Sequence, residues 1–404
     1  MAKPQIRLKG FEGEWENVGF KDFSYPTGEK NRDNLPLESY SISNEFGFVP
    51  QNEQFEKGGT MANADKRMYY IVKPDSFAYN PARINVGSIG YDNLDKDVIV
   101  SSLYVIFKTD SETNNEWLNI WFKTPYFKRL VELYQEGGVR LYFFYDKLCA
   151  CHLNRPLLLE QKAIADYFKS LDSMLQSTTK KIESLKQMKS ACLVSMFPQA
   201  GETTPRVRFK GFEGEWECEP LCNFSKKVIK KNQNLEYKIT LTNSAEYGII
   251  NQLDFFDHDV SNGDNIRGYY VVDNDDFVYN PRISATAPVG PINRNLLGYA
   301  GVMSPLYYVF RVHGIDKDYM SVFFKTTLWH KFMKDNGNSG ARFDRLSITD
   351  DVFVQMPILY PKDIKEQQRI ASYFRNLDKQ ISLQEKRLEK LKQIKAACLD
   401  KMFV

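Results

Sequence analysis

The sequence predicts an α+β protein made of two copies of one unit, and three observations lead to this prediction. The eight residues KGFEGEWE occur at 9–16 and again at 210–217. Short strand-like and helix-like patterns follow each copy, and each half then ends in a long helical pattern. A chain of 404 residues exceeds the usual size of a single hydrophobic core, so two bodies are expected.

The repeat extends over most of both halves. YYIV at 69–72 matches YYVV at 269–272, and FAYNPARI from Phe77 matches FVYNPRI from Phe277. Because the echoes keep nearly the same order and spacing, the halves should share one fold. We predict a first body over 1–157, a closing helix over 158–197, a linker over 198–204, a second body over 205–363 and a second closing helix over 364–404.

Each body should mix strands and helices. Residues 97–107 and 304–312 are rich in β-branched and aromatic side chains and predict strands. Helical patterns follow at 115–134 and 317–335. Strands and helices in separate runs are typical of α+β folds.

The closing segments predict two long helices that pair. Their apolar residues recur at alternating steps of four and three, which is a heptad pattern, and no Gly or Pro interrupts either run. Each helix would be roughly 60 Å long at about 1.5 Å per residue. The simplest partner for each seam is the other seam, paired antiparallel with a pseudo-two-fold axis; the alternative is that each helix packs only on its own body. The seam residues are Ile164, Phe168, Leu171, Leu175, Ile182, Leu185, Ile370, Phe374, Leu377, Ile381, Leu388 and Leu391.

The composition and the motifs exclude several kinds of chemistry. The sequence contains no GxxxxGK[ST] loop, no GxGxxG after a strand and no arrangement of its four histidines that suggests a catalytic triad. CACH at 149–152 and CEPLC at 218–222 are not repeated in the other half, so we expect no metal site. With no long apolar run, and with six cysteines that form no dense framework, we expect a cytoplasmic protein with reduced thiols. The short polar linker, which contains Gly201, is expected to act as a hinge or a tether.

Basic residues beside Gly-, Asn- and Ser-rich turns are the candidates for DNA contact. Arg can bind guanine bidentately, Asn can bind adenine and Lys binds phosphates. The net charge of +3 does not itself indicate nucleic acid, so any affinity must come from local patches. For a single basic residue a solvated surface is the alternative, and for the two YNP segments it is a turn that sets the backbone. The candidates are Arg67, Tyr79, Asn80, Arg83, Asn85, Arg140, Lys226, Lys227, Lys230, Lys231, Tyr279, Asn280, Arg282, Arg294, Arg342 and Arg345.

The repeated opening and closing motifs resemble those of one family. Two divergent bodies, each opened by PxxRxKGFEGEWE and closed by P…EQxxIAxYFxxLD…LKxxKxxCL…MF, resemble the specificity subunit of Type I restriction-modification enzymes over nearly the whole chain. One departure is that the spacing from Pro to Glu-Gln is shorter in the first half, from Pro156, than in the second, from Pro361.

The resemblance implies a fold and a function. Each body would be a target-recognition domain that reads one part of a bipartite, asymmetric sequence in double-stranded DNA. The helices would set the spacer and dock two methyltransferase subunits, and through them restriction subunits. This chain would carry no catalytic activity and no cofactor, because S-adenosylmethionine, ATP and Mg²⁺ would be bound by the partner subunits.

Two other functions remain as alternatives. A self-sufficient modifying enzyme would need a cofactor loop that the sequence lacks, and a coiled-coil scaffold without DNA specificity would leave the divergent Arg- and Asn-bearing loops unexplained. The repeated opening phrase, with Gly10, Phe11, Gly13 and Trp15, is expected to anchor the N-terminus of each body. A role in reading DNA is disfavoured because both halves would then read alike.

Overall fold

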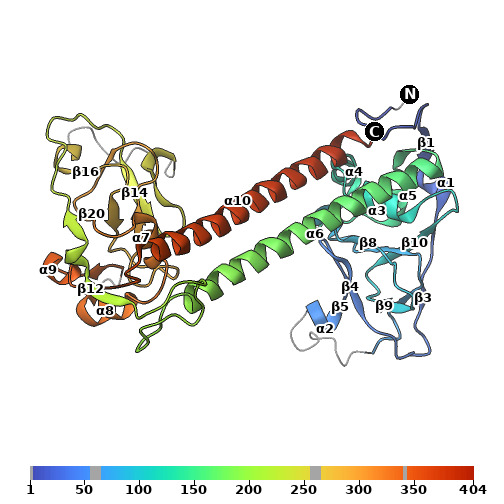
Figure 1. Ribbon diagram of the computed structural model, residues 1–404. Coiled ribbons are helices and arrows are strands. Elements are labelled where there is room, and N and C mark those ends of the chain that lie inside the picture. The colour runs from blue at the N-terminus through green and yellow to red at the C-terminus, as the bar shows by residue number, and fades with distance from the viewer. Residues whose placement is uncertain (1–2, 55–64, 255–264, 340–343) are drawn as a thin grey trace. The chain divides into compact units, whose positions relative to one another are not determined.

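The computed structural model describes residues 3–54, 65–254, 265–339 and 344–404, which form two compact units (Figure 1). The first unit contains Met1–Lys180 together with Glu385–Val404, and the second contains Lys181–Gln384. Each unit therefore combines one body with the first part of its own closing helix and the last part of the other closing helix. The boundary between the units crosses both long helices, whereas the sequence suggested the linker at 198–204.

The first body is built on a four-stranded antiparallel sheet in the order β2-β10-β7-β8. A three-stranded sheet, β3-β6-β9, and the hairpin β4-β5 accompany it. The strands are β2 (Ser24–Pro26), β3 (Glu29–Lys30), β4 (Tyr40–Ser43), β5 (Gly47–Pro50), β6 (Tyr70–Val72), β7 (Phe77–Tyr79), β8 (Ile89–Tyr91), β9 (Val98–Val100) and β10 (Val105–Thr109). The short helices are α1 (Phe20–Phe23), α2 (Gln51–Gln54), η2 (Ile84–Val86), α3 (Asn115–Trp121), α4 (Pro125–Tyr134) and α5 (Tyr145–Cys149).

Alternation along the central strands places the four-stranded sheet between two cores. Ala78 and Ile106 face the second sheet and the hairpin, in a cluster with Val100. Phe77 and Phe107 face the helices in the larger cluster, where their rings stack with centroids 5.0 Å apart. The aromatic richness noted in the sequence is therefore mainly core packing.

A two-stranded ribbon closes each body where the chain enters and leaves it. In the first body, β1 (Glu16–Gly19) pairs antiparallel with β11 (His152–Arg155). In the second, β12 (Glu217–Pro220) pairs in the same way with β23 (Pro357–Tyr360). The long helices begin directly after these ribbons.

The second body repeats the first, which supports the internal repeat as a repeat of fold. Its four-stranded sheet has the order β13-β20-β17-β18, with β16-β19 and the hairpin β14-β15 beside it. The strands are β13 (Ser225–Lys227), β14 (Leu241–Ser244), β15 (Gly248–Asn251), β16 (Tyr270–Val272), β17 (Phe277–Tyr279), β18 (Ile292–Arg294), β19 (Gly301–Met303), β20 (Tyr308–Val312), β21 (Asn338–Ser339) and β22 (Leu346–Ser347). The short helices are η3 (Leu221–Asn223), η4 (Gln252–Asp254), η5 (Asn265–Gly268), α7 (Lys317–Phe323), α8 (His330–Asn336) and α9 (Asp350–Phe353).

The two closing helices, α6 (Leu158–Ser195) and α10 (Ile364–Lys401), pair antiparallel within each unit. In the first unit Lys395 donates to Asp172, and the Tyr167 hydroxyl lies 3.7 Å from the Cys398 sulfur. In the second unit the same contacts recur: Lys189 donates to Asp378 at 2.5 Å, and Tyr373 contacts Cys192 at 3.4 Å. In both units residue numbers rise along one helix as they fall along the other.

The predicted seam positions are all buried or half-buried. Leu175, Leu388 and Leu391 are half-buried and the other nine are buried. The early positions Phe168 and Phe374 also belong to the cores of their own bodies, so the helices pack both on the bodies and on each other. The helices therefore pair as predicted, and the alternative in which each helix packs only on its own body does not hold.

The linker forms a turn that is hydrogen-bonded at both of its ends. Its Gln199 amide donates to the Val194 and Phe197 carbonyls at the end of α6, and Glu202 accepts from the Gln199 backbone N–H. The Thr203 carbonyl then accepts from the backbone N–H of Trp216. The chain after α6 is thus tied both to the helix end and to the second body.

Candidate DNA interface

In the second body, two loops that carry predicted arginines meet at one place. The Pro281 carbonyl accepts from Leu346 N–H at 2.8 Å, and the Asp344 carbonyl accepts from Ile283 N–H at 3.0 Å. These bonds pair Arg282 with Arg345 as direct antiparallel neighbours, and both side chains are exposed. We call this meeting of the YNP turn with the loop before α9 the second loop junction. Two exposed arginines at paired backbone positions can bind an anion such as a phosphate, although Arg345 Nε also lies 4.0 Å from Asp344 Oδ2.

The first body has the equivalent meeting of loops, which we call the first loop junction. The Pro81 carbonyl accepts from Phe143 N–H at 3.0 Å, and Glu136 pairs with Tyr142 at the base of the GGVRL loop. Arg83, which follows the YNP turn, and Arg140, in the loop, are both exposed. Asn85 is exposed in the same turn, and neighbouring Val139 is completely exposed.

The second body also carries the predicted basic strand. Lys226, Lys227, Lys230 and Lys231 are exposed, at β13 and just after it. The Lys227 ammonium lies over the Tyr308 ring, 5.4 Å from its centroid, and is paired with Asp350.

A small pocket connects the basic strand to the second loop junction. It has a volume of about 210 Å³, and its lining includes Lys227, Tyr308, Pro281 and Leu346. In the first body, the strand matching β13 carries Tyr25, so the basic strand belongs to one body only.

Tyr79 and Tyr279 are not available for DNA contact, which corrects their place among the candidates. Their side chains are 0% and 2% exposed and belong to the two large cores. The Tyr279 hydroxyl donates to the Val289 carbonyl at 3.0 Å, whereas the Tyr79 hydroxyl has no partner among the described residues. Burial raises the pKa of both phenols above their ordinary value.

The neighbouring asparagines set the backbone of the turn, as the alternative interpretation stated. Asn80 accepts from Ala82 N–H, and Asn280 accepts from Arg282 N–H, each at 3.0 Å. The Asn280 amide also donates to the Asn243 carbonyl at 2.9 Å. These contacts orient the arginine that follows each turn.

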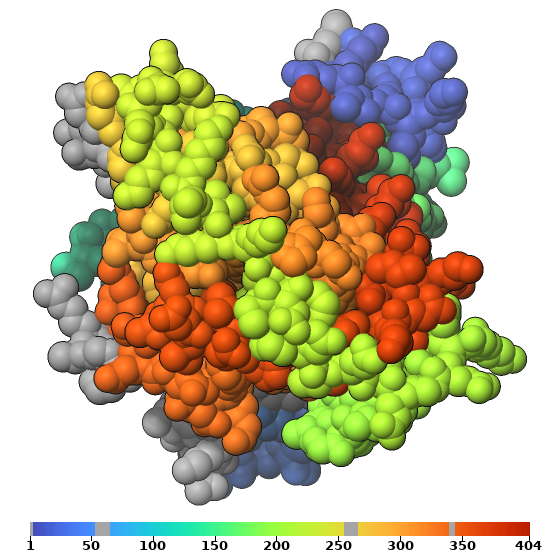
Figure 2. Space-filling view, turned by 60° about the vertical axis from the view of Figure 1, so that its left-hand side comes forward, coloured from blue at the N-terminus to red at the C-terminus, as the bar shows by residue number. Residues whose placement is uncertain are grey.

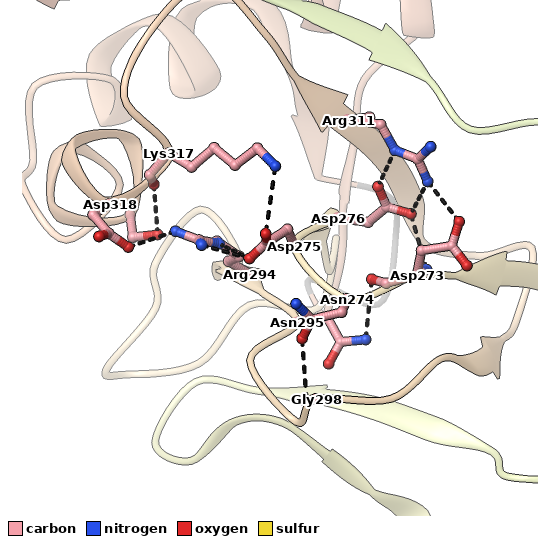
Figure 3. Close-up of polar contacts among 11 residues, drawn as sticks. Asp273, Asn274, Asp275, Asp276, Arg294, Asn295, Gly298, Arg311, Lys317 and Asp318 are labelled. Atoms are coloured by element: carbon pink, nitrogen blue, oxygen red, sulfur yellow. Dashed lines mark hydrogen bonds and ion pairs between the residues drawn. The ribbon is translucent and has the colours of Figure 1, made fainter. Parts of the chain in front are cut away.

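Arg294 is held by acidic neighbours and has little charge to offer a duplex. It donates to Asp275 at 2.8 Å and to Asp318 at 2.7 Å, and its side chain is 11% exposed (Figure 3). Burial acts to raise the pKa of Asp275, but the Arg294 guanidinium and Lys317 hold that pKa below its ordinary value. Figure 3 shows Arg311 held in the same way by Asp273 and Asp276. We therefore remove Arg294 from the candidate contacts.

Two further candidates add little to either junction. The Arg67 side chain is exposed, and its Nε lies 3.9 Å from the Asp65 carboxylate oxygen Oδ1. Arg342 lies outside the described residues.

The sequence did not single out the residues that hold the opening phrase. Arg7 donates to both carboxylate oxygens of Glu160, at 2.8 and 2.7 Å, and to the Gly13 carbonyl at 2.6 Å. Arg208 makes the same bonds to Glu366, at 2.7 and 2.8 Å, and to the Gly214 carbonyl. We call each of these the arginine clamp. Both the arginine and the glutamate of each clamp occur at matching positions of the repeat, and this recurrence could have indicated their role from the sequence.

The glutamine of each Glu-Gln pair anchors the start of the long helix to its body. Gln161 donates to the Pro156 carbonyl at 2.8 Å and accepts from Asn114 N–H at 2.7 Å. Gln367 likewise donates to the Pro361 carbonyl and accepts from Asp316 N–H. The different spacing of Pro and Glu-Gln in the two halves therefore leads to the same contacts.

The part of the chain that the structure describes holds no group of three or more His, Cys, Asp or Glu side chains suited to a metal ion. Cys151 is buried, which raises the pKa of its thiol to about 12 and disfavours the thiolate that binds metals. Among the described helices, none has the length and apolarity needed to cross a bilayer.

Comparison with known proteins connects this geometry to a family. Residues 224–393, which cover most of the second body and most of α10, match the family described as Type I restriction modification DNA specificity domain. Over these residues the chain is similar to this DNA specificity family. The first body and α6 repeat the four-stranded sheet, the hairpin and the long helix of the matched segment.

Solved structures of specificity subunits share the fold over the full length. The HsdS subunit from Thermoanaerobacter tengcongensis matches with a TM-score of 0.53 and 14% identity, covering 96% of each chain. The Type I S subunit from M. genitalium matches with a TM-score of 0.54 and 12% identity, covering 100% of this chain and 99% of that one. A chain from a study of complex assembly in the type I R-M system matches at 0.53 and 13%, covering 98% of both. A search of the curated proteins finds no significant match.

Proposed function

We propose that this chain is a specificity subunit that reads a two-part, asymmetric target in duplex DNA, with one part contacted by each loop junction. The single observation that supports this most strongly is the recurrence of the junction at the same place in both bodies with different residues around it. The first offers Arg83, Asn85 and Arg140, and the second offers Arg282 and Arg345. Equivalent positions with unequal side chains would read two different short sequences.

The basic strand of the second body would contribute affinity more than specificity. Lysine ammonium groups on an exposed strand suit phosphates, which carry no sequence information. Replacing Lys226 and Lys230 with Gln should therefore weaken binding to all sequences alike. The slope of affinity against salt concentration should become shallower by about 0.9 for each phosphate that the protein no longer neutralises.

The antiparallel helices would hold the two bodies at a set spacing and dock two methyltransferase subunits, and through them restriction subunits. Exposed apolar side chains support a docking role for the helices: Met188 and Leu383 in the second unit are 41% and 61% exposed. S-adenosylmethionine, ATP and Mg²⁺ would be bound by these partners, and the complex would act on cytoplasmic DNA. A scaffold without DNA specificity is the alternative, and the unequal junctions argue against it.

Modified-base sequencing of DNA from cells that express the chain with its methyltransferase tests the proposal. The wild type should give a two-part methylated motif with a fixed gap. Arg83→Ala should relax one part only and Arg282→Ala the other part only, each costing roughly 1–3 kcal/mol of discrimination at the affected base. Arg129→Ala, which removes an exposed arginine from α4, is the control and should leave the motif unchanged. A change in both parts from one substitution, or in neither part from both, would count against the junctions as reading sites.

A further inference from the structure

Each opening phrase is held at two points that belong to two different helices. In the first unit the Ile6 N–H donates to the Lys401 carbonyl at the end of α10, at 3.0 Å, while Arg7 binds Glu160 in the first turn of α6. In the second unit the Val207 N–H donates to the Ser195 carbonyl at the end of α6, at 2.9 Å, while Arg208 binds Glu366 in the first turn of α10. The opening phrase thus ties the beginning of one long helix to the end of the other.

The phrase is also part of the body that follows it. Trp15 and Trp216 are buried in the two large cores, and β1 and β12 begin at the residue that follows each of them. Each body is also joined to the helix pair where β11 or β23 leads into a long helix, and where apolar residues of the helix ends pack in its core. The clamp adds a charged attachment at a further point, which restricts rotation of the body about those contacts.

The clamp has the chemistry of a rigid contact. The Glu160 and Glu366 side chains are 3% and 1% exposed, and each arginine side chain is 17% exposed. A planar guanidinium that meets both carboxylate oxygens and two backbone carbonyls, those of Glu12 and Gly13 in the first unit, fixes its own orientation. Lysine, as a point charge on a flexible chain, would keep the charge and lose this geometry.

In Figure 2 the yellow-green surface of the linker and opening phrase of the second unit lies against the orange-red first turns of α10, as the Arg208–Glu366 bonds require. The reading surface lies elsewhere, because the clamp residues are neither in nor next to the loop junction of their body. Altering a clamp should therefore leave the sequence of each part unchanged.

We propose that the two arginine clamps are positioning contacts that fix the gap between the two parts of the DNA target, by holding each body in one orientation on the helix pair. This inference rests on the proposed function, since it presupposes a two-part target. It adds to that function the residues that would keep the gap at one length.

The test uses the full chain with its methyltransferase and compares methylation at the native gap with methylation at gaps one base pair longer or shorter. Glu160→Gln combined with Glu366→Gln keeps the shape of both carboxyl groups and removes their charge. Arg7→Lys combined with Arg208→Lys keeps the charge and removes the planar guanidinium that donates to both carboxylate oxygens. In both we expect the preference for the native gap to fall by roughly tenfold, the effect of losing one charge-assisted hydrogen bond, while the sequence of each part stays the same.

Arg206→Ala is the matched control, because Arg206 lies in the same phrase but pairs with Glu202 in an exposed contact outside the clamp. It should leave the gap preference unchanged. If the clamp variants lose methylation at the native gap without gaining it at other gaps, the clamps only stabilise the bodies and the inference is wrong. An unchanged preference in folded clamp variants overturns it too. A wild type that gives no two-part motif would instead refute the proposed function itself.

Discussion

At the scale of single residues, the two bodies can be compared at equivalent positions that hold different side chains. Asp92, after β8, occupies the place that Asn295 occupies after β18. The Asn295 amide donates to the Asp273 and Tyr299 carbonyls, at 3.1 and 3.0 Å. Asp92 is 0% exposed; one of its oxygens accepts from Leu94 N–H, and the other has no partner among the described residues. Burial raises the pKa of Asp92 to about 6.

Asp92→Asn should therefore stabilise the first body. The pKa of Asp92 is higher in the folded state than in the unfolded state. Below about pH 4 the carboxyl is protonated in both states and does not reduce the free energy of unfolding. As the pH rises through about 6 the buried group ionises, and that contribution to the free energy of unfolding is lost. At neutral pH the Asn variant should gain about 3 kcal/mol, since each unit of pKa corresponds to about 1.4 kcal/mol.

Urea unfolding of both proteins at pH 4.5 and at pH 7.5 measures this difference. Only the difference between the two proteins is informative, because it cancels the titration of the other carboxylates. Equal stability of the two proteins at both pH values would show that burial of the Asp92 carboxylate does not destabilise the fold.

At the scale of elements, a phenylalanine just after each long helix lies in the hydrophobic core of the same unit. Phe197, just after α6, is 0% exposed and contacts Trp216, Tyr319 and Phe374, with ring centroids 5.6 to 6.4 Å apart. Phe403, after α10, contacts Trp117 and Phe168 in the same manner. The helix pair is therefore held at its ends by aromatic packing as well as along its seam.

Truncating such a ring should destabilise the unit far more than truncating an exposed helix residue. Phe197→Ala should cost roughly 3–5 kcal/mol, because it leaves a cavity among three aromatic rings. Leu383→Ala on α10, at a side chain that is 61% exposed, should stay within about 0.5 kcal/mol of the wild type. Urea denaturation followed by tryptophan fluorescence compares the two variants; similar losses would show that the helix end is not a core element.

At the scale of the whole molecule, the ribbons define how a body can be exchanged. β1 pairs with β11 from Glu16–Arg155 to Gly19–His152, so both strands of the ribbon lie outside residues 20–151. A replacement of residues 20–151 keeps the ribbon, the opening phrase and the arginine clamp together.

Replacing residues 20–151 with the equivalent segment of another specificity subunit should change one part of the methylated motif and keep the other part and the gap. The reason is that the loop junction lies inside the exchanged segment, whereas the clamps and helices lie outside it. Modified-base sequencing of the hybrid with its methyltransferase reads both features at once. A changed gap, or a change in both parts, would contradict the modular organisation.

The sequence was most informative where structure depends on local pattern. The heptad steps predicted two helices, over 158–197 and 364–404, and the structure places them at Leu158–Ser195 and Ile364–Lys401. Repeated phrases likewise predicted two α+β bodies and the family. These features could be predicted because periodicity and repetition are properties of neighbouring residues.

The sequence by itself determined the duplication, the α+β class, the long helices and the resemblance to DNA specificity subunits. Only the tertiary structure decided which basic residues are free: Arg282 and Arg294 look alike in the sequence, yet one is exposed and the other is held between Asp275 and Asp318. It also decided that Arg7 meets Glu160. The physical reason is that the availability of a charge depends on partners brought from distant parts of the chain, which no local pattern encodes.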